Sequence, residues 1–437
     1  MTDFKLIPET VVVPALAGFG AQYNQNVYAA ISRNAGVTEA NVAGMEQKVL
    51  SLKPHFVRIF FDHHVFADPD RMQSFARTVE LAERSAASIN ITWQGGGTAS
   101  PERSMSQFGD LLVDLVNNGG IRKLKWVTVL NEPNSETGSV TMEVYERLYR
   151  LLDANLTTAG VRGQIRLMGG DLLGTKSGLG QTQEDWFTFL ATRMSDLLDA
   201  HSIHVYWDYW DTPKLERRLR EVRAIYDRLP PSGRKPLYVT EYGVRGHGFP
   251  DERPGTYEDG TPLQDTNINA FQHAWFALLA AKLGYYGMVK WDAYFGQYDR
   301  KPQDFRMIGR PQDGWLPRPV YWLIRILTRT VRVGWKVVRV DGAAGTKLVT
   351  AFAGPHGRVT VIGLDTAGGI LNGVSPTEGS YRLAGLPPNT SFQFLYWNRG
   401  GDGRNSRAAS LVSDRRGILT VTAPLHSVFA LTTLARP

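Results

Sequence analysis

The chain has 437 residues, 43% hydrophobic and 21% charged, a composition typical of folded globular proteins that excludes an intrinsically disordered chain. It contains no cysteine, which excludes disulfides, thiolate nucleophiles and cysteine-ligated zinc. Its net charge of +7 comes from basic residues mixed with acidic ones, as in KLERRLREVRAIYDR (214–228), so we predict no nucleic-acid partner.

The N-terminal segment MTDFKLIPETVVVPALAG has no basic stretch followed by an apolar run, and Pro14 interrupts its short apolar part. We therefore expect no signal peptide and a cytoplasmic location, with secretion as the alternative if a leader precedes this sequence. No run of 18 apolar residues occurs, so we predict neither a membrane span nor a membrane partner.

From residue 16 to 330, short apolar runs alternate with segments of helical periodicity, such as 142–156 and 269–283. Ser100 before Pro101 is typical of a helix start. The apolar runs predict eight strands, at 16–23, 55–61, 89–95, 125–132, 165–171, 202–208, 236–243 and 287–294.

Eight strands with mostly helical connections favour a parallel (β/α)8 TIM barrel over residues 16–330. The alternative is an open doubly wound sheet, which usually has about five to seven strands.

After residue 331 the pattern changes to short β-rich runs separated by Gly, Pro and Asn, without helical periodicity. The runs lie at 335–340, 346–354, 358–364, 391–397, 417–423 and 427–434. They predict a small antiparallel β-sandwich over 331–437, joined by a strand from residues 1–15. We expect this domain to serve packing.

Two predicted barrel strands end on a carboxylate, Glu132 in VTVLNEPNSE and Glu241 in YVTEYG. They are 241 − 132 = 109 residues apart, which corresponds to three βα units, and carboxyl ends of barrel strands meet at one mouth. Paired carboxylates in a sugar-sized cleft can supply the acid and the nucleophile of glycoside hydrolysis. The alternative is two salt-bridged glutamates in helix-capping loops.

The stretches LNEPN and VTEYG resemble the signatures of the clan A glycoside hydrolases, retaining (β/α)8 enzymes with glutamates on strands four and seven. The resemblance implies that Glu132 is the general acid/base and Glu241 the nucleophile. It spans the whole barrel segment.

Other positions extend this resemblance. It implies that Arg58 in VRIF lies near the nucleophile and that His204 and Tyr206 form a His-x-Tyr pair, whose tyrosine hydrogen-bonds the nucleophile. It further implies that Trp291 in VKWDAY floors the subsite of the attacked sugar and that Asn131 binds the sugar 2-hydroxyl. The residue chemistry agrees, because a cation such as Arg58 favours the charged form of a neighbouring carboxylate. Glu132, flanked by an amide rather than a cation, could hold its proton.

One departure concerns the end of strand three, which reads ITWQGGG where family 5 members usually have histidine. We predict Trp93 and Gln94 as an alternative sugar contact, and the barrel-plus-sandwich layout looks more like families 39 and 30. Trp207 and Trp210, on a predicted loop, are expected to contact substrate as well.

Asp62-His63-His64 and the pair His201/His204 could suggest a metal site. Residues three apart in a strand point to opposite faces, so His201 and His204 cannot share a site inside the barrel. We predict no catalytic metal and no cofactor.

The sequence thus predicts a retaining glycoside hydrolase that cleaves a β-glycoside, or an equivalent α-L-arabinoside, by double displacement. We expect exo-action on short oligosaccharides or glycosides. The alternatives are an endo-glycanase acting on a polysaccharide, a transglycosylase, and a catalytically silent carbohydrate-binding barrel.

Overall fold

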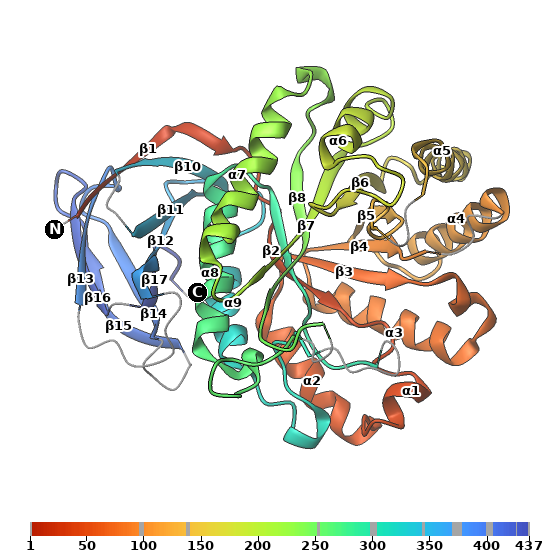
Figure 1. Ribbon diagram of the computed structural model, residues 1–437. Coiled ribbons are helices and arrows are strands. Elements are labelled where there is room, and N and C mark those ends of the chain that lie inside the picture. The colour runs from red at the N-terminus through yellow and green to blue at the C-terminus, as the bar shows by residue number, and fades with distance from the viewer. Residues whose placement is uncertain are drawn as a thin grey trace.

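The computed structural model describes residues 2–95, 100–136, 140–250, 254–297, 304–342, 346–368, 378–398, 405–424 and 426–435. Eight parallel strands close into a barrel in chain order (Figure 1). They are β2 (Gly18–Tyr23), β3 (Phe56–Phe61), β4 (Ser88–Trp93), β5 (Leu124–Val129), β6 (Arg166–Leu172), β7 (Ala200–Asp208), β8 (Leu237–Arg245) and β9 (Gly287–Lys290). The predicted (β/α)8 fold is confirmed, and the open sheet is excluded.

Helices follow the strands around the outside of the barrel (Figure 1). They are α1 (Ala30–Arg33), α2 (Glu39–Leu52), α3 (Pro69–Ser85), α4 (Pro101–Asn117), α5 (Met142–Thr158), α6 (Gln183–Thr192), α7 (Thr212–Arg228), α8 (Asn267–Lys282) and α9 (Pro319–Thr330). α4 begins directly after Ser100, as predicted, but the Ser100 side chain makes no capping hydrogen bond. In α7 the Asp211 side chain accepts from the backbone N–H of Lys214, which satisfies an otherwise unpaired donor of the first turn.

The strands read as apolar runs because both faces of a barrel strand are covered, one by the interior and the other by helices. In β3 every residue is buried, including Arg58. Five strands end elsewhere than the sequence predicts: β4 at Trp93, β5 at Val129, β6 at Leu172, β8 at Arg245 and β9 at Lys290. Asn131, Glu132 and Trp291 therefore lie just beyond their strands, at the mouth.

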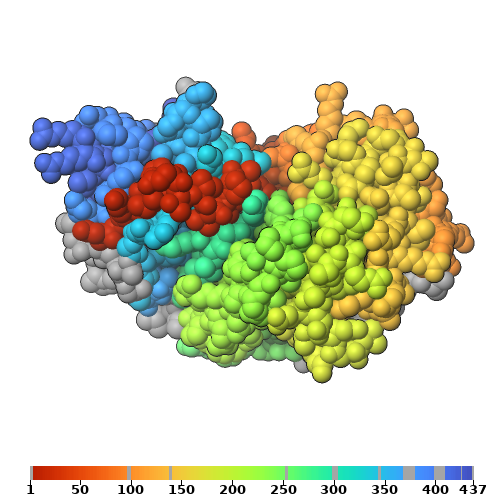
Figure 2. All heavy atoms as spheres, turned by 90° about the horizontal axis from the view of Figure 1, so that it is seen from above, coloured from red at the N-terminus to blue at the C-terminus, as the bar shows by residue number. Residues whose placement is uncertain are grey.

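The remaining strands form one nine-stranded sheet, ordered β15-β14-β17-β12-β11-β10-β1-β13-β16. They are β1 (Thr2–Val13), β10 (Lys336–Asp341), β11 (Lys347–Ala353), β12 (Val359–Asp365), β13 (Glu378–Ala384), β14 (Ser391–Asn398), β15 (Asn405–Val412), β16 (Leu419–Pro424) and β17 (Ser427–Thr432). The sequence did not predict β13 or β15. β1 pairs antiparallel with β10 and parallel with β13, so both ends of the chain supply strands, and the N-terminal residues lie across the C-terminal ones (Figure 2).

This sheet curls into the two packed layers of a sandwich. Tyr381 of β13 and Phe429 of β17 have ring centroids 4.8 Å apart, although four strands separate β13 from β17 in the sheet order. The two belong to one apolar cluster with Phe4 of β1 and Phe392 of β14. The sheet must fold over to bring these rings together, as the predicted β-sandwich requires.

α8 and α9 lie between the barrel and the sandwich (Figure 1). The residues of α8 from Ile268 to Ala281 are all buried, which explains why most of its residues are apolar on every side of the helix. Thr350 of β11 donates to the Leu278 carbonyl of α8 at 3.1 Å, across this junction. None of the helices in the described part of the chain is long and apolar enough to cross a membrane.

Candidate active site

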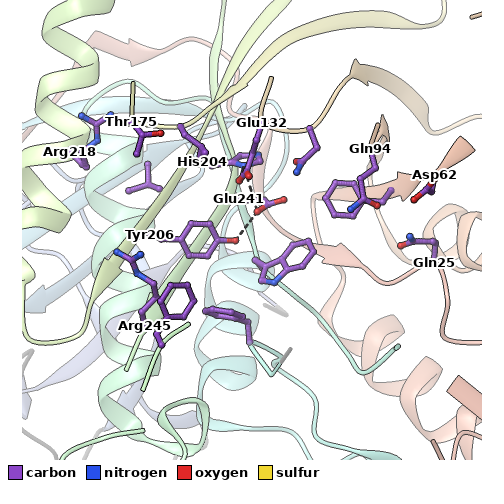
Figure 3. A pocket seen from close by; sticks show the side chains of 18 of the residues that line it. Gln25, Asp62, Gln94, Glu132, Thr175, His204, Tyr206, Arg218, Glu241 and Arg245 are labelled. Atoms are coloured by element: carbon purple, nitrogen blue, oxygen red, sulfur yellow. Dashed lines mark hydrogen bonds and ion pairs between the residues drawn. The ribbon is translucent and has the colours of Figure 1, made fainter. Parts of the chain in front are cut away.

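A cavity of about 710 Å³ opens at the carboxyl ends of the barrel strands (Figure 3). It is lined by residues that lie within or just after each of the eight strands, including Gln25, Phe60, Gln94, Asn131, Glu132, Thr175, His204, Tyr206, Arg218, Glu241, Arg245 and Trp291. Its volume falls within the range of about 300–1,000 Å³ usual for small-molecule sites.

The two glutamates face each other in this cavity. Glu241 lies within β8 and is 5% exposed, whereas Glu132 lies in the turn after β5 and its side chain is 27% exposed. One oxygen of each carboxylate lies within 4.8 Å of the other. Glu132 has a φ of 50°, in the left-handed region. Such backbone strain costs about 1–3 kcal/mol, and it persists only where the neighbouring structure holds the residue in this conformation.

The turn after β5 is tied to the segment after β6. The Asn134 amide nitrogen donates to the Leu173 carbonyl at 3.0 Å, and its amide oxygen accepts from the Leu173 N–H at 2.9 Å. These paired hydrogen bonds, two residues from Glu132, hold the turn in place.

The buried Arg58 side chain connects three residues of the site, Glu241, Asn131 and Asp171. Its Nη1 donates to Glu241 Oε1 at 2.5 Å, and its Nη2 donates to Asn131 Oδ1 at 2.8 Å and to Asp171 Oδ2 at 2.5 Å. Burial acts to lower the pKa of Arg58, but Asp171 and Glu241 outweigh burial and raise it. A permanent cation thus fixes one oxygen of Glu241.

His204 lies between three carboxylates. Its Nδ1 contacts Glu132 Oε1 at 2.8 Å and Glu241 Oε2 at 3.6 Å, and its Nε2 lies 3.6 Å from Asp171 Oδ1. Burial acts to lower the pKa of His204, but Glu241 and Asp171 outweigh it and raise the pKa to about 10. The imidazole is therefore protonated at neutral pH and donates to Glu132.

This contact corrects one sequence argument. Glu132 was expected to have an amide neighbour rather than a cation, but the fold brings the charged His204 ring against it. The neighbours of Glu132 in the chain do not include this cation, because His204 comes from another strand, β7. His204 fixes the direction of Oε1, which leaves Oε2 to meet a substrate.

Asp171 is a buried site residue that the sequence analysis missed. Besides Arg58, it accepts hydrogen bonds from Ser202 Oγ at 2.7 Å and from the Thr240 hydroxyl. Burial acts to raise its pKa, but Arg58 and His204 outweigh burial and hold it well below the usual range. A single charged residue in the otherwise apolar run LMGGD (167–171) was the available signal, because such residues are rarely buried without partners.

Aromatic side chains form the floor and one wall of the cavity. The Tyr206 hydroxyl donates to Glu241 Oε2 at 2.7 Å, and its ring contacts Phe305 with centroids 5.9 Å apart. Trp291 contacts Phe60 at 5.5 Å between centroids and is 6% exposed. Such faces can stack on the apolar faces of sugar rings.

Two of the predicted sugar contacts, Trp93 and Trp207, are not among the residues that line the cavity, because strand residues alternate between faces. Trp93 is buried against Phe108, with ring centroids 5.0 Å apart, whereas the next residue, Gln94, lines the cavity. Trp207 lies within β7 rather than on a loop. It stacks on Phe276 of α8 at 4.9 Å, and its Nε1 donates to Gln272 at 2.8 Å.

Trp210 is exposed but is not among the cavity-lining residues. Its ring stacks on His247 at 4.4 Å with an interplanar angle of 10°. The prediction that it contacts substrate therefore has no support from the cavity.

His201 lies on the other face of β7 from His204, among the rings of Phe187 and Tyr226. Neither ring nitrogen has a hydrogen-bond partner among the described residues, and burial lowers the pKa of His201 to about 3. Below the unfolded pKa of about 6.5 the unfolded chain binds a proton that the folded chain does not, so stability falls as the pH falls from about 6.5 toward 3.

We expect His201→Phe to reduce this acid sensitivity. At pH 5 the neutral His201 lowers the free energy of unfolding by about 2 kcal/mol, because the loss is about 1.4 kcal/mol for each pH unit below about 6.5. Urea denaturation would measure the free energy of unfolding of both proteins at pH 7 and at pH 5. The decrease from pH 7 to pH 5 should be about 2 kcal/mol smaller in His201→Phe than in the wild type. The exposed His64, replaced by alanine, is the control. An identical pH dependence in wild type and His201→Phe would refute a neutral, buried His201.

Two groups of side chains in the described part of the chain are close enough to hold a cation, Asp62-His63-His64 and Glu132-His204-Glu241. Metal ligation requires a neutral imidazole, whereas His204 is protonated, and Glu241 already accepts from the Arg58 guanidinium. The second group is thus better described as an ion-pair network. The absence of a catalytic metal stays a prediction.

Residues 85–304, half of the chain, match the family described as glycosyl hydrolase catalytic core. No curated protein sequence matches the chain. Similar solved structures include xylanase C of family 30 from Talaromyces cellulolyticus, with a TM-score of 0.68, 11% identity and coverage of 98% of this chain and 99% of that chain. For the family 30 endoxylanase from Clostridium papyrosolvens C71 the TM-score is 0.66 and the identity 13%, with coverage of 98% of this chain and 99% of that chain. For a glucosidase from Croceicoccus marinus the TM-score is 0.64 and the identity 12%, with coverage of 99% of this chain and 98% of that chain.

Proposed function

Because the chain belongs to the glycosyl hydrolase catalytic core family, it is a glycoside hydrolase, and we propose that it works by retaining double displacement through Glu132 and Glu241. The observation that carries this proposal is that one oxygen of Glu132 and one oxygen of Glu241 lie within 4.8 Å of each other. Carboxyl groups of retaining glycosidases are about 5–5.5 Å apart, whereas those of inverting ones are about 6.5–9.5 Å apart, to leave room for a water.

In the first step Glu241 attacks the anomeric carbon. Glu132, which in this step carries a proton on Oε2 while Oε1 accepts from His204, gives that proton to the leaving oxygen as the glycosidic bond breaks. Arg58 and Tyr206 hold one Glu241 oxygen each, so the carboxylate is oriented before substrate arrives. In the second step Glu132 takes a proton from water, which attacks the glycosyl ester and releases Glu241.

The size of the cavity favours a short substrate. Its volume of about 710 Å³ suits a ligand of small-molecule size, and this favours exo-action on oligosaccharides or glycosides. The resemblance to the clan A enzymes favours a β-glycoside, or the equivalent α-L-arabinoside, as the substrate. Endo-action is the second candidate, because the similar solved structures include endoxylanases.

The test is a panel of aryl β-xyloside, β-glucoside, β-galactoside and α-L-arabinoside. We expect turnover of at least one member, and the first-formed sugar should have the anomeric configuration of the substrate when proton NMR spectra are recorded before mutarotation. First appearance of the opposite anomer would refute the retaining mechanism. Rapid viscosity loss of a polysaccharide would refute exo-action alone.

A further inference from the structure

The cavity has different charges on its two sides, with Glu132 and Glu241 between them (Figure 3). On one side are Gln25, Asp62 and Gln94, together with Arg71, which pairs with Asp68 at 3.4 Å. On the other side are three cations, Lys214, Arg218 and Arg245.

The acidic residues near these cations are too few to neutralise them. Asp208 is shared between Lys214 Nζ, at 3.7 Å, and Arg245 Nε, at 3.2 Å. Glu221 is shared in the same way between Arg218, at 3.0 Å, and Arg217, at 3.7 Å. Within the described residues, four cations thus have two carboxylates at ion-pair distance, and excess positive charge faces the cavity.

The cations are partly buried and held in place. Side-chain exposure is 30% for Lys214, 21% for Arg218 and 22% for Arg245. Arg218 Nη2 donates to Gln183 Oε1 at 2.7 Å and lies against Gly174, where a Cβ would come within 2.3 Å of it. The Arg245 guanidinium lies 5.0 Å from the centroid of Phe249. Partial burial strengthens their attraction for an anion, and fixed positions reduce the entropy lost on binding.

The position of this basic side relative to the glutamates identifies what it would meet. On the proposed function, on which this argument rests, the attacked sugar lies over Trp291 and beside Asn131. The leaving group then lies beyond Glu132, toward Thr175 after β6 and Lys214 and Arg218 in α7. The basic side is therefore the leaving-group side.

We infer that the leaving-group side of the cavity binds a sugar unit with an anionic substituent, either a carboxylate or a sulfate ester. The two guanidinium groups and the ammonium can donate charge-assisted hydrogen bonds to such a group. A neutral unit would leave the excess positive charge uncompensated in a partly dehydrated site, so the same cations disfavour it.

Binding measurements separate this inference from the chemistry. Titration calorimetry on the Glu241→Ala protein would compare 4-carboxyphenyl, 4-sulfophenyl and 4-carbamoylphenyl glycosides of the four sugars in the panel. We expect one anionic ligand to bind about 10-fold more tightly than its neutral carbamoyl counterpart, the gain of one charge-assisted hydrogen bond at a partly exposed site. Tighter carboxyphenyl binding would indicate a uronic acid, and tighter sulfophenyl binding a sulfate ester.

Arg218→Gln and Lys214→Gln, each in the Glu241→Ala background, should reduce this preference to about 2-fold or less. Arg220→Gln, which removes a charge from the same helix outside the cavity, where Arg220 pairs with Glu216, should leave it unchanged. Equal affinity for charged and neutral ligands, or a preference that survives both substitutions, would overturn the inference. If the anion preference is present but the protein with Glu241 intact cleaves none of the ligands, the proposed function fails and the anion site stands.

Discussion

Replacing Glu241 with alanine should abolish turnover of any aryl glycoside that the wild-type protein cleaves, with kcat reduced by at least about 10⁴-fold. The reason is that the carboxylate that shares Arg58 with Glu241, that of Asp171, is fully buried and already bound to Arg58, so it cannot replace Glu241 as the nucleophile. Added azide should restore part of the activity by entering the space left by the carboxylate. The glycosyl azide should then have the opposite anomeric configuration to the substrate.

Controls are needed because Glu241 also neutralises buried Arg58. Glu241→Gln keeps the side-chain volume, and Glu184→Ala removes an exposed glutamate that pairs with Arg228 far from the cavity. Thermal unfolding should show folded protein for all three variants. Activity of Glu241→Ala within about 10-fold of wild type would exclude Glu241 as the nucleophile.

Replacing Glu132 with alanine should slow hydrolysis according to the leaving group. For an alkyl glycoside, whose leaving oxygen needs a proton, we expect kcat/KM to fall by about 10³–10⁴-fold. For a 2,4-dinitrophenyl glycoside, whose leaving group departs as the anion, the loss in kcat/KM should be about 10-fold or less. Azide should accelerate release of the glycosyl group, and this product should retain the configuration of the substrate.

The partner for comparison is His204→Gln, which removes the imidazolium that donates to Glu132 but keeps the carboxyl group. It should lower kcat/KM without the dependence on leaving group seen in Glu132→Ala. If Glu132→Ala loses the same factor on both glycosides, Glu132 does not act as the general acid.

The sequence predicts the barrel well because each strand is a short apolar run and each helix has its own periodicity. It predicts the sandwich less completely. β13, EGSYRLA, and β15, NSRAASLV, contain several polar residues, so their strand signal is weak. β13 is defined by pairing with β1 and β16, and β15 by pairing with β14.

Site residues could be predicted where they stand at strand ends. Glu132, Glu241 and Tyr206 follow from their place in the barrel, and the structure brings all three into one cavity. Trp207 could have been excluded from the sequence, because His204 and Tyr206 point to one face of the strand and Trp207 must point to the other. Its helix partner Phe276, 69 residues later, is not visible from the sequence pattern.

Two features depend on contacts between distant segments. Asp171, Arg58 and His204 come from three strands, and their shared charges decide which groups are ionised. The basic side of the cavity combines the face of α7 carrying Lys214 and Arg218 with Arg245 at the end of β8. In the sequence, α7 reads as a solvated amphipathic helix, and only the fold shows which of its cations face the cavity.

The central claim is a covalent glycosyl–Glu241 intermediate, and trapping it is the most direct test. The protein would be incubated with the 2-deoxy-2-fluoro form of the glycoside that it cleaves, digested, and its peptides sequenced by mass spectrometry. The account predicts one added fluoroglycosyl group per chain, located on Glu241. A label on any other residue, or an unlabelled protein that releases the opposite anomer, would contradict it.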